Sequence, residues 1–254
     1  MPRAQTQMDR FPPDTPLVDL VRPSPNSGDR RGRRADAIVL HYTGMPTAEG
    51  ALDRLCDQAA EVSAHYFVYE DGRIVQLVPE ERRAWHAGRS CWAGETDMNS
   101  ASIGIEIANP GHDGGAPPFP AAQIAAVARL CADIMRRRAI PRERLLAHSD
   151  ISPGRKIDPG EMFPWRGLAE AGVGLWIDPA SDRPGLILAR GATGAPVQAL
   201  QARLALFGYG LNATGVYDAA TETVVAAFQR RYRPARIDGV ADPATAATIE
   251  RYLA

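Results

Sequence analysis

Two of the five histidines lie where short apolar strands are expected to end. His41 closes the run Ala-Ile-Val-Leu at 37–40, and His148 follows Leu-Leu-Ala at 145–147. Runs of this composition predict buried strands, and ligand sites in open α/β sheets collect at strand ends. The two imidazoles are therefore candidate metal ligands, although a lone histidine at a strand end more often has a structural role.

A loop rich in Pro and Gly follows His148 and brings two carboxylates with it, Asp150 and Asp158. Two imidazoles and one carboxylate form a common catalytic zinc set, which leaves the fourth position of the ion open for water. The spacing alone does not show that His41 and His148 bind the same ion. It also does not decide whether Asp150 or Asp158 is the third ligand.

The elements that must position these residues alternate between strand and helix patterns. The apolar spacing predicts helices over 47–61 and 121–138, and Asp71-Gly72 is typical of a hairpin turn between strands at 65–69 and 73–77. Ile103, Ile105 and Ile107 share one face of a further strand over 102–108. This order predicts an α/β fold with a mixed central sheet flanked by helices.

The amino-acid composition changes near the C-terminus, which indicates a second structural unit. Residues 178–193 are rich in Pro, Gly, Asp and Ser, as in a linker, and helical patterns fill the residues after them. The expected organisation is an N-terminal arm (1–35), a catalytic domain (36–177), a linker (178–193) and a small C-terminal three-helix domain (194–254).

Charge and cysteine content exclude several classes of protein. With 254 residues, 23% charged residues and a net charge of −1, the chain does not have the basic character of a nucleic-acid binder. Its three scattered cysteines fit neither a disulfide framework nor a cysteine-nucleophile motif. No run reaches the roughly 18 apolar residues of a transmembrane segment.

The N-terminal residues show no signal-peptide pattern, which favours the cytoplasm or export by a non-classical route. Cysteine usage leaves the compartment open, and the sequence says nothing about the oligomeric state.

Six ordered motifs over about residues 36–167 resemble the zinc-dependent N-acetylmuramoyl-L-alanine amidases, a family that includes the peptidoglycan-recognition-protein fold. The motifs are VLHYT (39–43), VSAHYFV (62–68), AWHAG (84–88), SIGIEI (102–107), AHSDISPGRK (147–156) and DPG (158–160). The resemblance implies a peptidoglycan-recognition-protein-like fold. It also implies a zinc cofactor held by His41, His148 and Asp158.

Carried over residue by residue, the resemblance implies Glu106 as general base and Lys156 as stabiliser of the oxyanion. It also implies that His86, in the AWHAG motif, contributes to substrate binding. Glu106 shares a strand face with Gly104 and Ala108, where a substrate could approach. A carboxylate there can carry a proton from water to the leaving nitrogen, and a nearby ammonium can offset the charge of a tetrahedral intermediate.

The C-terminal unit resembles a three-helix peptidoglycan-binding domain through the motifs VQALQ (197–201), GVYD (215–218), VVAAFQ (224–229) and IDGVAD (237–242). The expected partners are therefore peptidoglycan or its muropeptide fragments. Because this unit supplies none of the proposed site residues, we expect the catalytic domain to act on small muropeptides without it.

Together these features predict hydrolysis of the amide between N-acetylmuramoyl, or anhydro-muramoyl, groups and the L-alanine of the stem peptide. The alternative is a non-catalytic peptidoglycan-binding receptor, a role for which members of the family typically lack the third ligand. Intact wall and anhydro-muropeptides both remain open as substrates.

Overall fold

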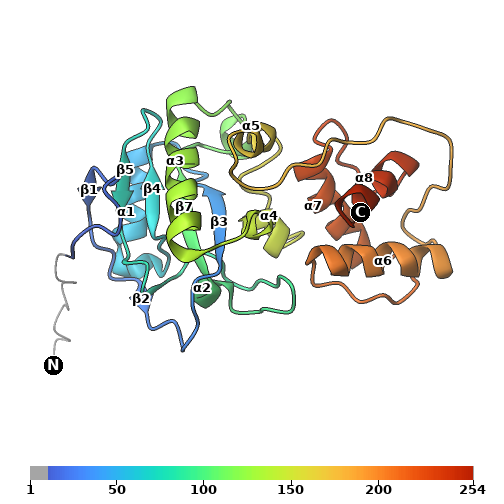
Figure 1. The fold of residues 1–254 in the computed structure, drawn as a ribbon, viewed down its shortest axis with the longest axis horizontal. Helices are drawn as coiled ribbons and strands as arrows, with labels where there is room; N and C mark the ends of the chain where they lie inside the picture. Colours follow the sequence, from blue (N-terminus) through green and yellow to red (C-terminus); the bar gives the residue numbers. More distant parts are fainter. Residues whose placement is uncertain (1–10, 254) are drawn as a thin grey trace.

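The computed structural model describes residues 11–253, in which a mixed six-stranded sheet lies between helices and three more helices stand at its side (Figure 1). The sheet order is β1-β5-β4-β7-β3-β8, and only the β4–β5 pair is antiparallel. β2 and β6 form a separate antiparallel pair. The strands are β1 (Leu20–Val21), β2 (Ser27–Gly28), β3 (Ala37–Tyr42), β4 (Tyr66–Val68), β5 (Ile74–Gln76), β6 (Arg83–Ala84), β7 (Ser102–Ile107) and β8 (Leu145–Ala147).

Helices cover both faces of the sheet, so the fold class predicted from the sequence is confirmed. The helices are α1 (Ala48–Cys56), α2 (Met98–Ala101), α3 (Ala121–Arg138), α4 (His148–Ile151), α5 (Trp165–Glu170), α6 (Ala195–Phe207), α7 (Ala219–Tyr232) and α8 (Pro243–Leu253), with 3₁₀ turns at Gln58–Ala60, His112–Gly114 and Arg142–Arg144. Among residues 11–253, no helix combines the length and apolar character needed to cross a bilayer.

The apolar periodicity explains how the helices pack. α3 buries Val127, Leu130 and Ile134, three or four residues apart, against the isoleucines of β7. α1 buries Leu52 and Leu55 against the opposite face of the sheet. β3 is covered on both sides, since Ile38 and Leu40 lie in the cluster with α3 and Ala37 and Val39 lie in a second buried cluster with Trp92.

Part of the segment expected as an N-terminal arm belongs to the sheet. β1 pairs in parallel with β5 at the sheet edge, and β2 pairs with β6. Strands of two residues are too short for the alternation that reveals a strand in sequence. Residues 1–10 of the expected arm lie outside the described residues.

The segment expected as a linker lies against the C-terminal helices. Leu188 forms a β-bridge with Ala241, and the amide of Ala180 donates to the hydroxyl of Thr248. The three helices also pack on the sheet domain, where Trp92 contacts the rings of Phe207 and Tyr209. The domain boundaries themselves stay a prediction.

Candidate metal centre

The candidate ligands stand at the carboxyl ends of two adjacent parallel strands. On β3, Leu40 pairs with Ala147, the last residue of β8, so His41 and His148 follow side by side. On the other side of β3, His41 pairs with Glu106 of β7. Parallel pairing thus brings Glu106 and His148, which follow His41 by 65 and 107 positions in the chain, to the two sides of His41.

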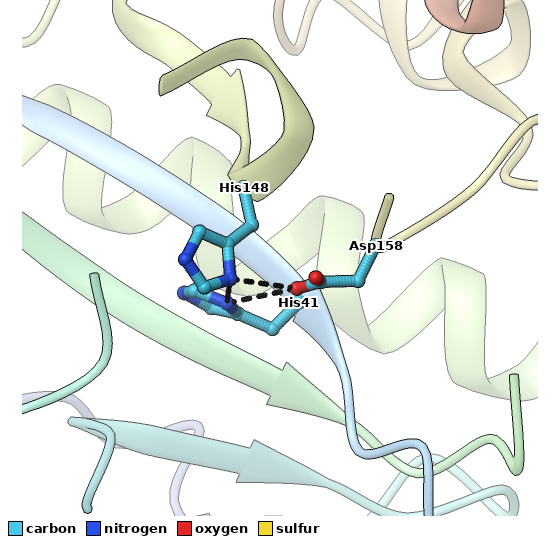
Figure 2. Close-up of side chains that lie close together, drawn as sticks. All are labelled: His41, His148 and Asp158. Carbon is cyan, nitrogen blue, oxygen red and sulfur yellow. Dashed lines mark hydrogen bonds and ion pairs between the residues drawn. The ribbon is translucent and has the colours of Figure 1, made fainter. Parts of the chain in front are cut away.

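Three donor atoms converge at this point (Figure 2). The two Nδ1 atoms of His41 and His148 are 2.9 Å apart, and Oδ2 of Asp158 lies 3.1 Å from the first and 3.0 Å from the second. Tetrahedral zinc with bonds of about 2.0–2.1 Å would separate its ligands by about 3.3 Å. The donor set therefore fits a small divalent ion in both chemistry and spacing.

Burial and mutual charge shape the protonation of this cluster. Burial, followed by the neighbouring His148, lowers the pKa of His41 to about 4. Burial opposes ionisation of Asp158, yet His148 and His41 together hold its pKa well below the usual range. At neutral pH the cluster thus offers a neutral imidazole and a carboxylate, the forms that bind metal.

The far nitrogen of each histidine ligand is also held. Nε2 of His41 lies 3.1 Å from Nδ1 of His86, and Nε2 of His148 lies 3.1 Å from the carbonyl of Ala87. A proton on each Nε2 donates to Nδ1 of His86 or to the carbonyl of Ala87 and leaves each Nδ1 lone pair directed at the site. The Arg155 guanidinium lies 3.2 Å from the same Nε2 of His148. Such outer contacts fix the tautomer and ring orientation of metal-binding histidines.

His86 is itself fixed in place. The amides of His86 and Ala87 both donate to Oδ1 of Asn99, at 2.8 and 2.7 Å. Its ring lies over Gly104, where an added Cβ would come within 2.4 Å of the His86 ring. Only glycine fits at position 104, so the small residue seen in the strand pattern makes room for this histidine.

Glu106 has an unusual environment for a carboxylate that lines an open cleft. Its Oε2 is inaccessible to solvent and has no hydrogen-bond partner among the described residues. Burial, followed by the negative charge of Asp158, raises the pKa of Glu106 well above its usual value, and Lys156 opposes this effect. A carboxyl group in this state is suited to proton transfer.

An open cleft of about 530 Å³ gives access to these groups. His41, Glu106, His148 and Asp158 line it, together with Lys156 and His86. The six site residues that the family resemblance implied therefore meet in one cavity. Within residues 11–253 the Lys156 ammonium makes no hydrogen bond or ion pair, so it is free to meet a substrate.

Asp150, the other carboxylate that the spacing allowed as a ligand, faces away from the cluster. Its Oδ2 accepts from the amide of Ala147 and from the guanidinium of Arg231, at 2.8 and 2.6 Å, while Oδ1 accepts from the hydroxyl of Tyr209. Its oxygens are thus fully engaged, which leaves Asp158 as the carboxylate in the cluster.

Comparison with known proteins agrees with this geometry. Residues 31–161 match the family model of N-acetylmuramoyl-L-alanine amidase, and residues 193–249 match that of a peptidoglycan binding domain. The chain is 40% identical to the N-acetylmuramoyl-L-alanine amidase AmiD of Escherichia coli K12 over 234 residues, which cover 87% of this chain and 83% of the relative. The chain belongs to the N-acetylmuramoyl-L-alanine amidase family.

Solved structures support the same assignment for this amidase. AmiD from E. coli, in complex with the substrate anhydro-N-acetylmuramic acid-L-Ala-D-gamma-Glu-L-Lys, superposes with a TM-score of 0.73 at 36% identity, covering 90% of this chain and 91% of that one. AmpDh3 from Pseudomonas aeruginosa, in complex with an anhydromuramic pentapeptide, gives 0.73 at 33% identity with 99% of both chains covered. The catalytic interpretation is confirmed over the alternative of a non-catalytic receptor.

Sequence reasoning missed some groups that shape the site of the amidase. The contact of His86 with His41 was not foreseen, nor was the role of Asn99 in fixing His86. Arg155 was not singled out, yet its guanidinium donates to the carbonyls of Ala87 and Arg89 at the cleft edge. His112 was not singled out either, and it contacts the Tyr42 hydroxyl and Glu161. Only the small residue Gly104 in the strand pattern could have indicated where the His86 ring lies.

Proposed function

We propose that this amidase hydrolyses the bond between the lactyl group of muramic acid and the L-alanine of the stem peptide, with one zinc ion held by His41, His148 and Asp158. The observation that carries the proposal is the convergence of three donor atoms about 3 Å apart at the floor of an open cleft, beside a carboxylate without a partner. When bound, zinc supplies a Lewis acid that polarises the carbonyl and lowers the pKa of water to about 7.

Glu106 acts as the general base in this proposal. It accepts the proton of the attacking water and returns it to the leaving nitrogen, so that L-alanine departs as an amine. The raised pKa of Glu106 favours this second transfer, because a weakly acidic carboxyl group holds the proton until the nitrogen can take it. Lys156 lines the same cleft, has no ion-pair partner in the described part of the chain, and stabilises the negative charge that develops on the carbonyl oxygen.

His86 stays a candidate for substrate binding, since it lines the cleft. Its Nδ1 faces the Nε2 of His41, and its side chain is largely buried, which favours a role in orienting that ligand. The variant His86→Gln separates the two roles. Weaker zinc binding indicates orientation of His41, whereas a raised KM with unchanged zinc binding indicates substrate contact.

The substrate class follows from the relatives. AmiD and AmpDh3 were solved with anhydro-muramyl peptides, and we propose that anhydro-muropeptides are substrates of this chain too. The C-terminal unit, which matches a peptidoglycan binding domain, would hold the same polymer at a second site.

The central test is product analysis with the purified chain. Incubation with anhydro-N-acetylmuramyl tripeptide should release free tripeptide with an L-alanine amino terminus, and elemental analysis should find about one zinc per chain. Intact substrate after incubation of the zinc-loaded chain would overturn the proposed reaction, and retention of zinc by His148→Ala would overturn the ligand set.

The second site is tested with the full-length Glu106→Gln variant, which should bind the wall without degrading it. The variant should co-sediment with sacculi even when excess soluble muropeptide fills the catalytic cleft. Release of the protein by soluble muropeptide would show that the catalytic cleft alone holds the polymer.

A further inference from the structure

The segment from His148 to Asp158 carries two of the three metal donors but little regular structure of its own. α4 supplies its first turn, and the amide of Ser149 donates to the carbonyl of Asp158, which closes the loop. On the side of the sheet domain, the hydroxyl of Ser152 donates to the carbonyl of Arg89. The positions of the metal-binding atoms on this loop therefore depend on the residues that pack against its outer side.

The outer side of this loop is held by α7 of the C-terminal unit. Arg231 donates to Oδ2 of Asp150 at 2.6 Å, two residues after His148, and the two side chains are 3% and 0% exposed. The Tyr209 hydroxyl donates to Oδ1 of the same carboxylate at 3.2 Å. Both oxygens of Asp150 are therefore engaged by residues of the C-terminal unit that lie 59 and 81 positions further along the chain.

Arg231 also fastens α7 to the sheet domain at other points. Its second terminal nitrogen donates to the carbonyls of Leu145 and Leu175, and its guanidinium carbon lies 4.0 Å from the ring centroid of Trp165. Leu145 begins β8, the strand that leads into His148. The same side chain thus fixes the strand before the ligand and the turn after it.

The neighbouring residue of α7 contacts the other end of the loop. Arg230 pairs with Oε2 of Glu161 at 3.3 Å, three residues after Asp158. Glu161 also accepts from His112, so this contact connects α7 with the 3₁₀ turn at the cleft edge. Two consecutive arginines therefore hold carboxylates just beyond each of the two metal donors.

We propose that Arg231, assisted by Arg230, is a positioning residue for the metal centre, so that the C-terminal unit is part of what makes the catalytic site. This inference rests on the proposed zinc site. It differs from the expectation that the sheet domain acts alone on small muropeptides. The physical reason is that a buried carboxylate keeps its place only while its cation partner is present, since an uncompensated buried charge is strongly unfavourable.

The test measures zinc affinity in the full-length chain by competition with a chelator of known affinity, together with thermal unfolding. Loss of an outer-shell partner typically weakens metal binding by 10–100-fold, and Arg231→Met should weaken it by at least about 10-fold. Arg231→Lys, which keeps a charge but fewer donors, should recover part of the loss. Arg190→Met is the matched control, because Arg190 pairs with Glu222 on the exposed side of the same unit. The control should change zinc affinity by less than about two-fold.

Arg230→Met covers the case in which Arg231→Met does not fold, since Arg230 is partly exposed and its loss should leave the fold intact. It should weaken zinc binding by a few-fold. The cobalt-loaded variants should show altered visible absorption, which a change in global stability alone does not cause. Zinc affinity and cobalt spectra equal to those of the parent in both variants would overturn the inference. A parent chain that holds no zinc would instead overturn the proposed metal site.

Discussion

Two glutamates of the sheet domain, Glu80 and Glu106, have opposite surroundings. Glu80 is fully buried and accepts from the hydroxyl of Tyr66 and from the guanidinium groups of Arg137 and Arg138. Glu106 has an inaccessible oxygen with no partner among the described residues. Burial opposes ionisation in both, but the hydrogen bonds from Arg137 and the other partners lower the pKa of Glu80, whereas the pKa of Glu106 is raised.

The difference separates a structural role from a chemical one. A carboxylate whose oxygens all accept hydrogen bonds stabilises the fold in its ionised form, and it has no free lone pair for a substrate. An unsatisfied carboxylate costs stability, and such a group persists where it does chemistry. The comparison predicts that substitutions at the two glutamates act on different measurable quantities.

The largest expected effect is on turnover. Glu106→Gln is nearly isosteric but cannot accept a proton, so kcat should fall about 100- to 10,000-fold while zinc content stays unchanged. The check is the rate of release of free peptide from an anhydro-muropeptide, with zinc measured on the same sample. A rate within a few-fold of the parent would remove Glu106 from the mechanism.

Glu80→Gln should show the reverse pattern. Removing this charge takes away the buried carboxylate that Arg137 and Arg138 share, at a cost of about 3 kcal/mol. For a chain of this size that corresponds to a fall in Tm of roughly 6–12 °C. At a temperature where the variant is folded, its kcat should match that of the parent. A loss of kcat comparable to that of Glu106→Gln would show that Glu80 is not purely structural.

The cations beside the two carboxylates extend the comparison. Lys156→Met should lower kcat about 100- to 1,000-fold, the range for removing one stabilising group of an oxyanion. Its Tm should stay nearly unchanged, because the Lys156 ammonium makes no hydrogen bond or ion pair within residues 11–253. Arg137→Met should lower Tm and leave kcat unchanged, since Arg137 binds Glu80 and Asp133. Kinetics and thermal unfolding of both variants decide whether the two clusters are independent.

The smallest expected effect is on the pH dependence of stability in the metal-free protein. A carboxyl group with a raised folded pKa contributes stability below its unfolded pKa and loses it as the pH rises through the folded pKa. Metal-free Glu106→Gln should therefore be more stable than the parent at pH 8, with a gain in stability that fades towards pH 5.

Glu80 has a lowered pKa, so the loss of stability in Glu80→Gln should be full at pH 8 and fade only in acid. Thermal unfolding between pH 4 and pH 8 measures both trends, and a gain for Glu106→Gln that grows in acid would contradict the argument.

Much of the molecule could be predicted from its sequence. The period of the apolar residues indicated β3, β7 and α3, since a strand or helix covered by a core must repeat its apolar residues at the spacing of that element. The chemistry of the side chains indicated an imidazole–carboxylate metal site, because few residue types bind such ions. Resemblance to a family, carried by ordered motifs, then pointed to Asp158 and Glu106.

Only the tertiary structure decided which groups meet. β3 lies between β7 and β8, so parallel pairing sets His41 beside Glu106 on one side and His148 on the other. No local spacing in the chain encodes those contacts. The same holds for Arg231, whose place on a helix surface gives no sign that it is buried against Asp150. Sequence determines residue type and local periodicity, whereas burial, partners and the resulting pKa values arise from segments that are distant in the chain and adjacent only in the fold.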